Sequence, residues 1–355
     1  MSLRHAVLLF TLLAAPAFAA GPAVIPIDKV GDAYAQPHQR IEVEPGRRMN
    51  LYCIGSGSPT VVFDSGLSDW SNTWALIQPA VATRTRACSY DRAGMGYSDA
   101  STQPRTPLNI VHDLHALLER AGIRGPLVLV GHSLGGFNMK LYAALYPERV
   151  AGAVLVDPSE ERLWERVGPA LSLQFGDTLV HDAALDDSSS FGELVAHLRE
   201  CAQQTRAGKL DDALYAQCTD PVRTPLGPAI LAERRRLQAS SAYQDTQLGE
   251  AAASMFVADA VADAQYARLF GAAPHPLGDK PLVVLTHSVW DMTPPFGETG
   301  YASWVAAHRQ TAALSTRGSE RMVPLSRHNI QVDHPQVVID AIAEVLDAID
   351  APAPR

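Results

Sequence analysis

The sequence predicts an α/β fold in which a mostly parallel sheet carries helices on both faces. Short apolar runs rich in β-branched residues, such as 60–63 and 126–130, alternate along the chain with stretches of helical periodicity. Such runs suit strands buried on both faces, and their alternation with helices favours parallel pairing. A long segment, 158–275, has no convincing buried strand. We therefore expect one core, made of 41–157 and 276–350, with a helical insertion between its two parts.

The individual elements follow from apolar patterning and turn residues. The strands expected in the core are 41–43, 48–54, 60–63, 86–90, 126–130, 150–156, 281–285 and 322–325. The helices expected there are 72–84, 106–118, 137–146 and 335–349. The second of these is opened by Thr106, repeats apolar residues at helical spacing and is ended by Gly122. The insertion has helical stretches near 191–204, 226–240 and 246–270.

Composition places the chain among ordinary globular proteins. It has 355 residues, of which 47% are hydrophobic and 19% charged, and its formal net charge is −9. An acidic balance of this size gives no affinity for nucleic acid, and no run of Lys or Arg suggests a surface that follows phosphates. We expect no nucleic-acid partner. The oligomeric state is not predicted.

The N-terminus predicts export. Arg4 and His5 precede the apolar run 6–15, which is followed by a small-x-small pattern at Ala17-Phe18-Ala19. The run is too short to span a bilayer, so residues 1–20 are interpreted as a cleavable signal peptide, with an uncleaved N-terminal anchor as the alternative. Residues 21–40 are expected to form an extended lead-in. The mature protein is expected to be secreted or periplasmic, without stable membrane insertion.

The four cysteines predict two disulfides. An even number of cysteines in an oxidising compartment favours pairing. Of the three possible pairings, proximity in sequence favours Cys201 with Cys218, which leaves Cys53 with Cys88. No two of these cysteines form a CxxC pair, so we expect no metal site and no cofactor.

A nucleophile is predicted at Ser133. The segment Gly131-x-Ser133-x-Gly135 stands between a buried strand and a helix, and a sharp reversal there forces the serine backbone into a strained conformation. The two glycines lack Cβ atoms, so neighbouring elements can approach closely. Ser133 is then held at the carboxyl end of the sheet, where α/β sheets bind ligands.

Three further segments complete a resemblance to the α/β-hydrolase superfamily. They are Val-Val-Phe-Asp-Ser-Gly-Leu at 61–67, Tyr-Asp-Arg-Ala-Gly-Met-Gly-Tyr-Ser at 90–98, and Ser-Arg-His-Asn-Ile at 326–330 followed by His-Pro. With the Ser133 motif, the chain resembles exported, bacterial-type serine hydrolases and esterases with a helical cap. The resemblance implies a mostly parallel sheet of the eight-stranded type and a cap at 158–275, inserted after the strand that ends at Asp157.

The resemblance also implies a base and an acid, in the chain order Ser, acid, His. His328 follows the last strand and is the expected base; His334 is interpreted as a helix cap or surface residue. The expected acid is Asp291, because it follows the strand 281–285 at the spacing of the family. Asp157 is the alternative acid, since some relatives use the end of the preceding strand.

The oxyanion hole is expected to use the backbone N–H groups of Leu67 and Leu134. The resemblance also makes the strands of Cys53 and Cys88 neighbours. Possible pocket residues are Ser65, Gly66, His132 and Trp74. Asp91 and Arg92 are expected to pair with each other and to order their turn, and the run Arg234-Arg235-Arg236 is interpreted as a solvated helix face.

Hydrolysis of a carboxylic ester through an acyl-enzyme is the leading functional expectation, with a small-molecule ester or related acyl compound as substrate. A peptidase, amidase or lactonase would use the same triad. A binding protein without activity on a hydrolase scaffold is the alternative from another class.

Overall fold

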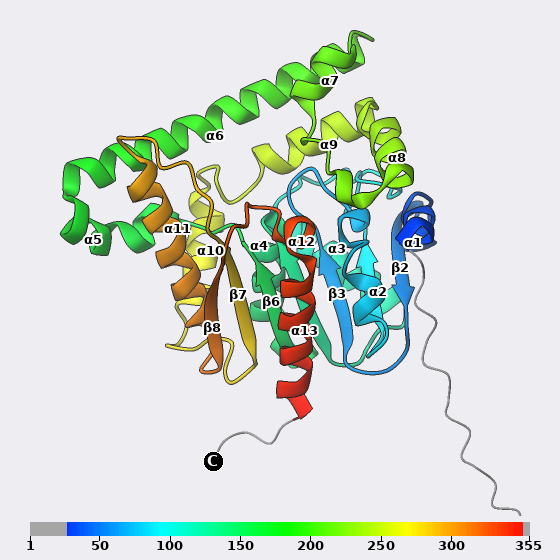
Figure 1. Ribbon diagram of the computed structural model, residues 1–355, viewed down its shortest axis with the longest axis horizontal. Coiled ribbons are helices and arrows are strands. Elements are labelled where there is room, and N and C mark those ends of the chain that lie inside the picture. Colours follow the sequence, from blue (N-terminus) through cyan, green and yellow to red (C-terminus); the bar gives the residue numbers. More distant parts are fainter. Residues whose placement is uncertain (1–26, 351–355) are drawn as a thin grey trace, which may run out of the picture.

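The computed structural model describes residues 27–350 of the chain (Figure 1). The expected signal peptide at 1–20 and the first part of the lead-in lie outside the described residues. Eight strands form one sheet in the order β1-β2-β4-β3-β5-β6-β7-β8. The pairs β1/β2 and β2/β4 are antiparallel, and every other neighbouring pair is parallel. The predicted α/β fold with a mostly parallel sheet is confirmed.

The strands are β1 (Gln39–Glu44), β2 (Arg47–Ile54), β3 (Thr60–Asp64), β4 (Ala87–Tyr90), β5 (Leu127–His132), β6 (Val150–Val156), β7 (Leu282–His287) and β8 (Gly318–Val323). The core helices are α2 (Gln78–Val81), α3 (Pro107–Arg120), α4 (Leu134–Leu145), α11 (Gly297–Ala312), α12 (Ile330–Asp333) and α13 (Pro335–Asp350), with short 3₁₀ turns η1 (Ser71–Trp74) and η2 (Pro147–Arg149). Every residue of β3, β4, β5 and β7 is buried, as expected for strands covered on both faces.

The two faces of the sheet have separate apolar clusters. One cluster joins alternate strand residues to α3 and α4, and the other joins the remaining strand residues to α2 and α13. The alternation along β5 illustrates this, because Leu127 and Leu129 belong to the first cluster and Val128 and Val130 to the second.

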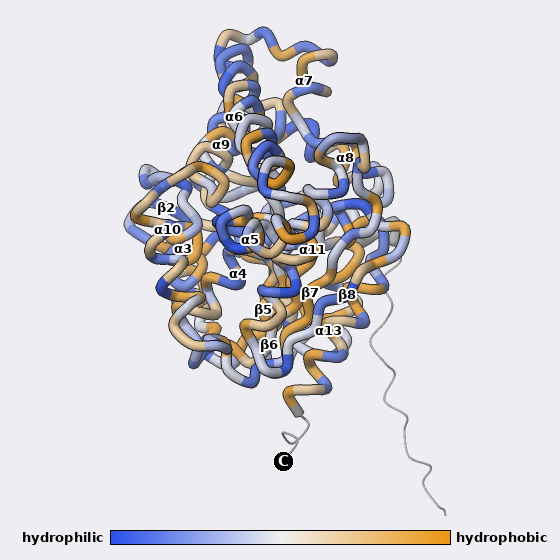
Figure 2. The backbone as a smooth tube through the Cα atoms, turned by 90° about the vertical axis from the view of Figure 1, so that its left-hand side faces the viewer, coloured by the Kyte–Doolittle hydropathy of each residue, from blue (hydrophilic) through white to orange (hydrophobic). Residues whose placement is uncertain are grey.

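The insertion is helical, as expected, and lies at the carboxyl ends of the central strands (Figure 1). It contains α5 (Leu163–Phe175), α6 (Asp177–Arg206), α7 (Asp212–Cys218), η3 (Thr224–Leu226), α8 (Pro228–Gln238), α9 (Ser241–Ala252) and α10 (Ala260–Phe270). Figure 2 shows that hydrophilic and hydrophobic stretches alternate along these helices. None of the helices in 27–350 combines the length and apolar character needed to cross a membrane.

Several elements differ from expectation. The helix expected at 72–84 is only the turn η1 followed by the short α2, and α5 and α7 were not among the expected helices. Within the lead-in expected to be extended, α1 (Ile27–Tyr34) is a helix, and Tyr34 packs with Leu226 and Ile230 of the insertion. The last strand is β8, which begins four residues before the expected start at Met322. Helix α11 was not expected, because much of its buried face is polar and gives no apolar periodicity.

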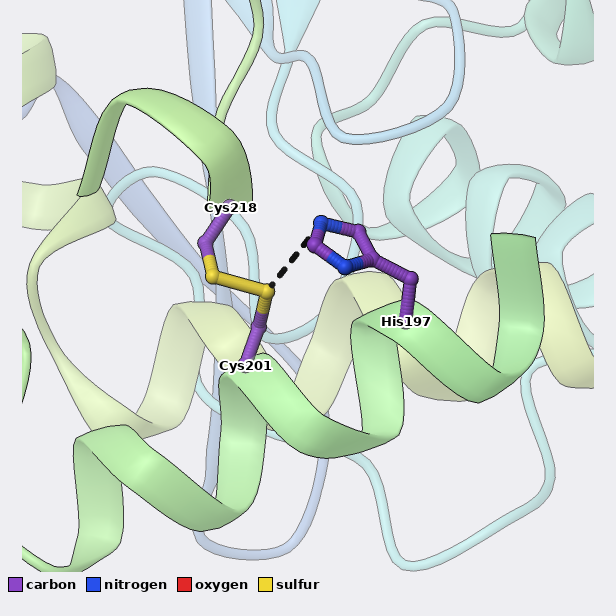
Figure 3. A group of neighbouring side chains, drawn as sticks. All are labelled: His197, Cys201 and Cys218. Atoms are coloured by element: carbon purple, nitrogen blue, oxygen red, sulfur yellow. Dashed lines mark hydrogen bonds between the residues drawn. A yellow bond between two sulfur atoms is a disulfide. The ribbon is translucent and has the colours of Figure 1, made fainter. Parts of the chain in front are cut away.

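Both expected disulfides are present. Cys53 and Cys88 are direct partners on the antiparallel strands β2 and β4, with Cα atoms 4.1 Å apart. Cys201 of α6 is joined to Cys218 at the end of α7, with Cα atoms 5.6 Å apart (Figure 3). All four cysteines are therefore oxidised, and the second disulfide fixes α7 against the long helix of the insertion.

Candidate active site

Ser133 occupies a strained turn between β5 and α4. Its φ is 52° and its ψ is −120°, a conformation that non-glycine residues rarely adopt. A Cβ on Gly131 would lie 2.3 Å from the carbonyl oxygen of Gly135, and a Cβ on Gly135 would lie 2.4 Å from that of Asp64. The two glycines thus allow the close approach that the turn requires, in agreement with the sequence interpretation.

A cavity of about 380 Å³ opens above this turn. Ser133 and His328 both line it, and so does Ser159, whose Oγ lies 3.3 Å from Ser133 Oγ. The structure therefore brings the predicted nucleophile and base to one cavity. Sequence reasoning did not find Ser159; its position two residues after the strand-end aspartate Asp157 was the available signal.

The acid beside His328 is Asp157. Asp157 Oδ2 lies 2.5 Å from His328 Nδ1, whereas Asp291 is exposed and its carboxylate accepts hydrogen bonds from Thr293. The assignment of Asp291 is corrected on this geometry. The cause lies at the end of β7. His287, the last residue of this strand, fills the space next to Asp157, and the following loop places Asp291 at a second cleft.

Asp157 is fully buried and accepts hydrogen bonds at both oxygens. Oδ1 accepts from the His287 backbone N–H at 3.1 Å and from Trp304 Nε1 at 3.0 Å. Oδ2 bonds to the Nδ1 atoms of His287 and His328 at 2.6 and 2.5 Å. Burial alone would raise the pKa of Asp157, but the hydrogen bonds from His287 and His328 outweigh it and hold that pKa well below its usual range. The carboxylate is therefore ionised at neutral pH, and it orients His328 with Nε2 as the ring nitrogen left free for chemistry.

His132, which precedes the nucleophile, supports the loop of His328. Its Nε2 bonds to the His328 carbonyl oxygen at 2.9 Å, and its ring lines the cavity. Burial, reinforced by the neighbouring His328, lowers the pKa of His132 to about 3. His132 is therefore neutral and donates from Nε2. His334, by contrast, is half-buried outside the cavity and bonds to the Leu325 carbonyl oxygen, in agreement with a surface or capping role.

The residues that carry the two expected oxyanion donors belong to the same cavity. Leu67 and Leu134 both line it, and neither amide is bonded to an acceptor among residues 27–350. Leu134 is the first residue of α4, so its N–H is one of those that an α-helix leaves unsatisfied and that favour negative charge. The pair can stabilise an oxyanion formed above Ser133.

The other expected pocket residues divide into two groups. Gly66 and His132 line the cavity, whereas Ser65 and Trp74 do not. Trp74 is fully buried, packs against Phe63 and donates its indole N–H to Ser65 Oγ at 3.1 Å. Trp74 and Ser65 therefore anchor the segment after β3 instead of contacting a ligand.

Asp91 and Arg92 do not pair with each other. Asp91 accepts hydrogen bonds from Asn50 and from two backbone amides, so it orders the turn alone. Arg92 points into the core and forms ion pairs with Asp64 and Glu250. The expectation of an Asp91–Arg92 pair is wrong, because both partners of Arg92 come from segments distant in sequence.

The arginine run of α8 is only partly solvated. Arg235 and Arg236 are exposed, as expected. Arg234 is buried, stacks on the Trp70 ring and donates to Asp69 at 2.7 Å. The interpretation of the whole run as a solvated face is wrong for Arg234, because the helical geometry of α8 points this side chain toward the core.

Two clusters among the described residues have the composition of a metal site, but their donor atoms are already engaged. Cys201 and Cys218 next to His197 are joined in the disulfide, so neither offers a thiolate (Figure 3). In the other cluster, the Nδ1 atoms of His287 and His328 both bond to Asp157. The second cluster is better explained as a carboxylate that orients two imidazoles.

Comparison with known proteins identifies the fold. The model of a family described as alpha/beta hydrolase fold matches residues 59–335. The chain is 34% identical over 105 residues to the uncharacterized protein YqjL of Bacillus subtilis, which is 30% of this chain and 42% of YqjL. It is also 34% identical over 102 residues to a (lyso)-N-acylphosphatidylethanolamine lipase of Bos taurus, which is 28% of this chain and 30% of the lipase. The matched segment thus spans less than half the length of these relatives.

A solved structure resembles the whole fold. The structure of a thermophilic esterase from Thermogutta terrifontis superposes with a TM-score of 0.57 at 18% identity, over 89% of this chain and all of the esterase chain. At this identity the likeness supports the fold alone.

Proposed function

The chain belongs to the alpha/beta hydrolase family, and we propose that it is a serine hydrolase that cleaves carboxylic esters through an acyl-enzyme. The observation that carries the proposal is one cavity lined by both Ser133, on its strained turn, and His328, which is bonded to the buried Asp157. A serine hydroxyl is a weak nucleophile unless a base takes its proton, and this arrangement supplies an oriented base.

The proposed reaction begins with attack by Ser133 Oγ on the ester carbonyl carbon while His328 Nε2 takes the serine proton. The N–H groups of Leu67 and Leu134 stabilise the oxyanion of the tetrahedral intermediate. The C–O bond to the alcohol then breaks, His328 returns its proton to the leaving oxygen, and the acyl group stays on Ser133. Water deacylates the enzyme with His328 as base, and Asp157 stabilises the imidazolium in both halves.

The cavity wall contributed by the insertion supports an apolar group on the substrate. Phe191, Leu194 and Leu198 of α6, together with Phe256, line the same cavity as the nucleophile. Such a surface favours an acyl chain or an alcohol that is itself apolar. A small-molecule ester is therefore the proposed substrate class; amides, peptides and lactones would use the same catalytic groups.

We also propose that the protein is exported. The oxidation of all four cysteines in two disulfides is compatible with a secreted or periplasmic location. The signal peptide expected at 1–20 would be removed, and N-terminal sequencing of the exported protein would then start near residue 20. A cytoplasmic protein with an intact N-terminus would contradict this.

Covalent labelling tests the activity. A fluorophosphonate probe is expected to label the wild type and not Ser133→Ala, and p-nitrophenyl butyrate hydrolysis is expected to disappear in the same variant. Because Ser159 Oγ lies only 3.3 Å from Ser133 Oγ, mass spectrometry of the labelled peptide must separate the two serines. Label on Ser159, or no label on the wild type, would overturn the proposal.

A further inference from the structure

A buried guanidinium contacts the segment from Asp64 to Asp69, which carries one proposed oxyanion donor, at several points. Arg92 is 1% exposed and donates to three carbonyl oxygens of this segment. The distances are 2.5 Å to Ser65, 2.7 Å to Gly66 and 3.3 Å to Asp69. Arg92 therefore fixes the backbone on both sides of Leu67.

The bond to the Gly66 carbonyl has a direct consequence for Leu67. The Gly66 C=O and the Leu67 N–H belong to the same peptide group, which is planar and trans, so the two point in opposite directions. A donor that fixes the Gly66 oxygen thereby sets the direction of the Leu67 N–H. A charged donor on the oxygen also polarises the peptide group and makes its N–H a stronger donor.

Arg92 is oriented in turn by the insertion. Glu250 of α9 accepts from Arg92 Nε at 2.6 Å and from Nη2 at 2.8 Å, a two-pronged carboxylate–guanidinium pair whose members are 0% and 1% exposed. From the core side, Asp64 accepts from Nη1 at 2.8 Å. The guanidinium plane is thus set jointly by a core carboxylate and a carboxylate of the insertion. The Gly66 carbonyl accepts from this guanidinium and also from the Asp69 backbone N–H at 3.1 Å.

The insertion holds the same segment at a second point. Tyr243 of α9 donates its hydroxyl to the Ser68 carbonyl at 2.8 Å, and Ser68 has a φ of 65°, a conformation that its surroundings must maintain. Two side chains of one helix, Tyr243 and Glu250, therefore act on the loop that contains Leu67.

We propose that Glu250 and Arg92 are positioning residues of the oxyanion hole, which act in the order Glu250, Arg92, Gly66 carbonyl, Leu67 N–H. The insertion then does more than enclose the substrate, because one of its carboxylates sets a group that stabilises the transition state. This inference rests on the proposed serine-hydrolase function.

The test is Glu250→Gln, which keeps the size of the side chain and removes its charge and one of its two acceptors. With p-nitrophenyl butyrate, kcat is expected to fall about tenfold to a hundredfold while KM stays within about twofold, because the oxyanion exists only after attack. Affinity for an alkyl trifluoromethyl ketone, which forms an oxyanion on Ser133, should fall by the same factor as kcat/KM. Affinity for the corresponding methyl ketone should not change. A purely structural role for Glu250 would not separate the two ketones.

Asp113→Asn is the matched control. Asp113 accepts from Arg47 at 2.6 and 3.1 Å in a partly buried pair outside the cavity, so its variant should lose stability and keep kcat. Arg92→Lys keeps the positive charge but loses the several N–H donors of the guanidinium. It should therefore reproduce the effect of Glu250→Gln on kcat and ketone affinity. If Glu250→Gln does not unfold cooperatively, Glu250→Asp carries the test with the same ketones.

The outcomes separate this inference from the proposed function. An active wild type, with Glu250→Gln retaining wild-type kcat and trifluoromethyl ketone affinity, overturns the positioning role alone. A wild type that neither hydrolyses esters nor binds the fluorophosphonate overturns both.

Discussion

The two sides of the cavity are held by different interactions. The floor, which we define as the ends of β3, β5 and β6 with the turns that follow them, rests on apolar packing. Every residue of β5 is buried, and alternate residues enter the two apolar clusters of the sheet. Burial of this kind gives cohesion without strong directional preference.

The roof, which we define as α6 to α9, meets the floor largely through buried charges. Arg92 pairs with Glu250, and Asp69 pairs with Arg223 and Arg234. All five side chains are at most 10% exposed. Removing charges from water offsets much of what such pairs gain, so they add little net stability, but their geometry is specific. The difference suggests that apolar packing maintains the floor and that ion pairs set where the roof sits upon it.

The largest expected effect concerns the acid, because only one of the two candidates belongs to the floor. Asp157 belongs to the floor, and Asp291 lies in the cleft beside α6. Asp157→Asn should lower kcat by about 10⁴, since the imidazole loses the partner that fixes its tautomer. Asp291→Asn, which changes only the contact with Thr293, should keep kcat. Steady-state kinetics on one ester decide between them, and a larger loss in Asp291→Asn would contradict the assignment.

That pair of residues also shows what the sequence could and could not predict. Ser133 was predictable because its strand, turn and helix are contiguous in the sequence, and the glycines on either side of it indicate the sharp turn directly. His328 was predictable from its place after the last strand. Asp157 could not be chosen over Asp291 from spacing, because the choice depends on His287 bonding to Asp157 at the end of β7 and on Trp304 donating from α11.

Helix α11 and the ion pairs of the roof were hidden for a related reason. The buried face of α11 includes Thr299, Ser303, His308 and Thr311, which give no apolar period. A buried charge such as Arg234 looks in the sequence like a solvated one. Apolar periodicity therefore predicted the sheet, whereas contacts between polar groups distant in sequence required the structure.

The second prediction compares an ion pair between floor and roof with apolar packing against the sheet, at similar loss of stability. Asp69→Asn leaves Arg223 and Arg234 buried beside a neutral partner, and should cost about 3–5 kcal/mol of unfolding free energy. Leu117→Ala leaves a cavity in the apolar cluster that includes α3, and should lower the unfolding free energy by about 2–5 kcal/mol. Urea unfolding measures both losses.

Kinetics then distinguish the two variants. Asp69→Asn should also lower kcat, because Asp69 ends the segment that carries Leu67, whereas Leu117→Ala should keep kcat under conditions where it is folded. Equal effects on kcat would mean that the charges of the roof contribute only stability.

The disulfides give a third, smaller contrast. The bridge between Cys201 and Cys218 closes a short segment of the roof, and Cys218 itself lines the cavity. Replacing both cysteines by serine should cost about 2–4 kcal/mol and raise KM for esters with long acyl chains. Replacing Cys53 and Cys88, which join two strands away from the cavity, should lower stability without changing KM. An unchanged KM in both variants would show that the first bridge does not shape the cavity.

The smallest effect is expected in the pH dependence of stability, through a further buried pair next to the floor. Lys140 of α4 donates to Glu160 at 2.7 Å, and Arg166 donates to the same carboxylate at 2.9 Å. Burial would raise the pKa of Glu160, but the charges of Lys140 and Arg166 outweigh it and lower that pKa below its ordinary value. A carboxyl with a lowered folded-state pKa stabilises the protein above its unfolded pKa of about 4.3, and this stability is lost as the pH falls below that value.

Glu160→Gln removes this titration. Between about pH 4.3 and 2.5, the unfolding free energy of the wild type should fall more steeply than that of the variant, by at most about 1.4 kcal/mol per pH unit for the one proton involved. Urea unfolding at several pH values measures the two slopes, with Glu165→Gln on the exposed surface as control. Because Glu165 is exposed and its ion pair with Arg162 is screened by solvent, its variant should keep nearly the wild-type slope. Parallel slopes for wild type and Glu160→Gln would mean that this buried pair does not couple protonation to folding. The charges between α4 and the insertion would then set only where the insertion sits.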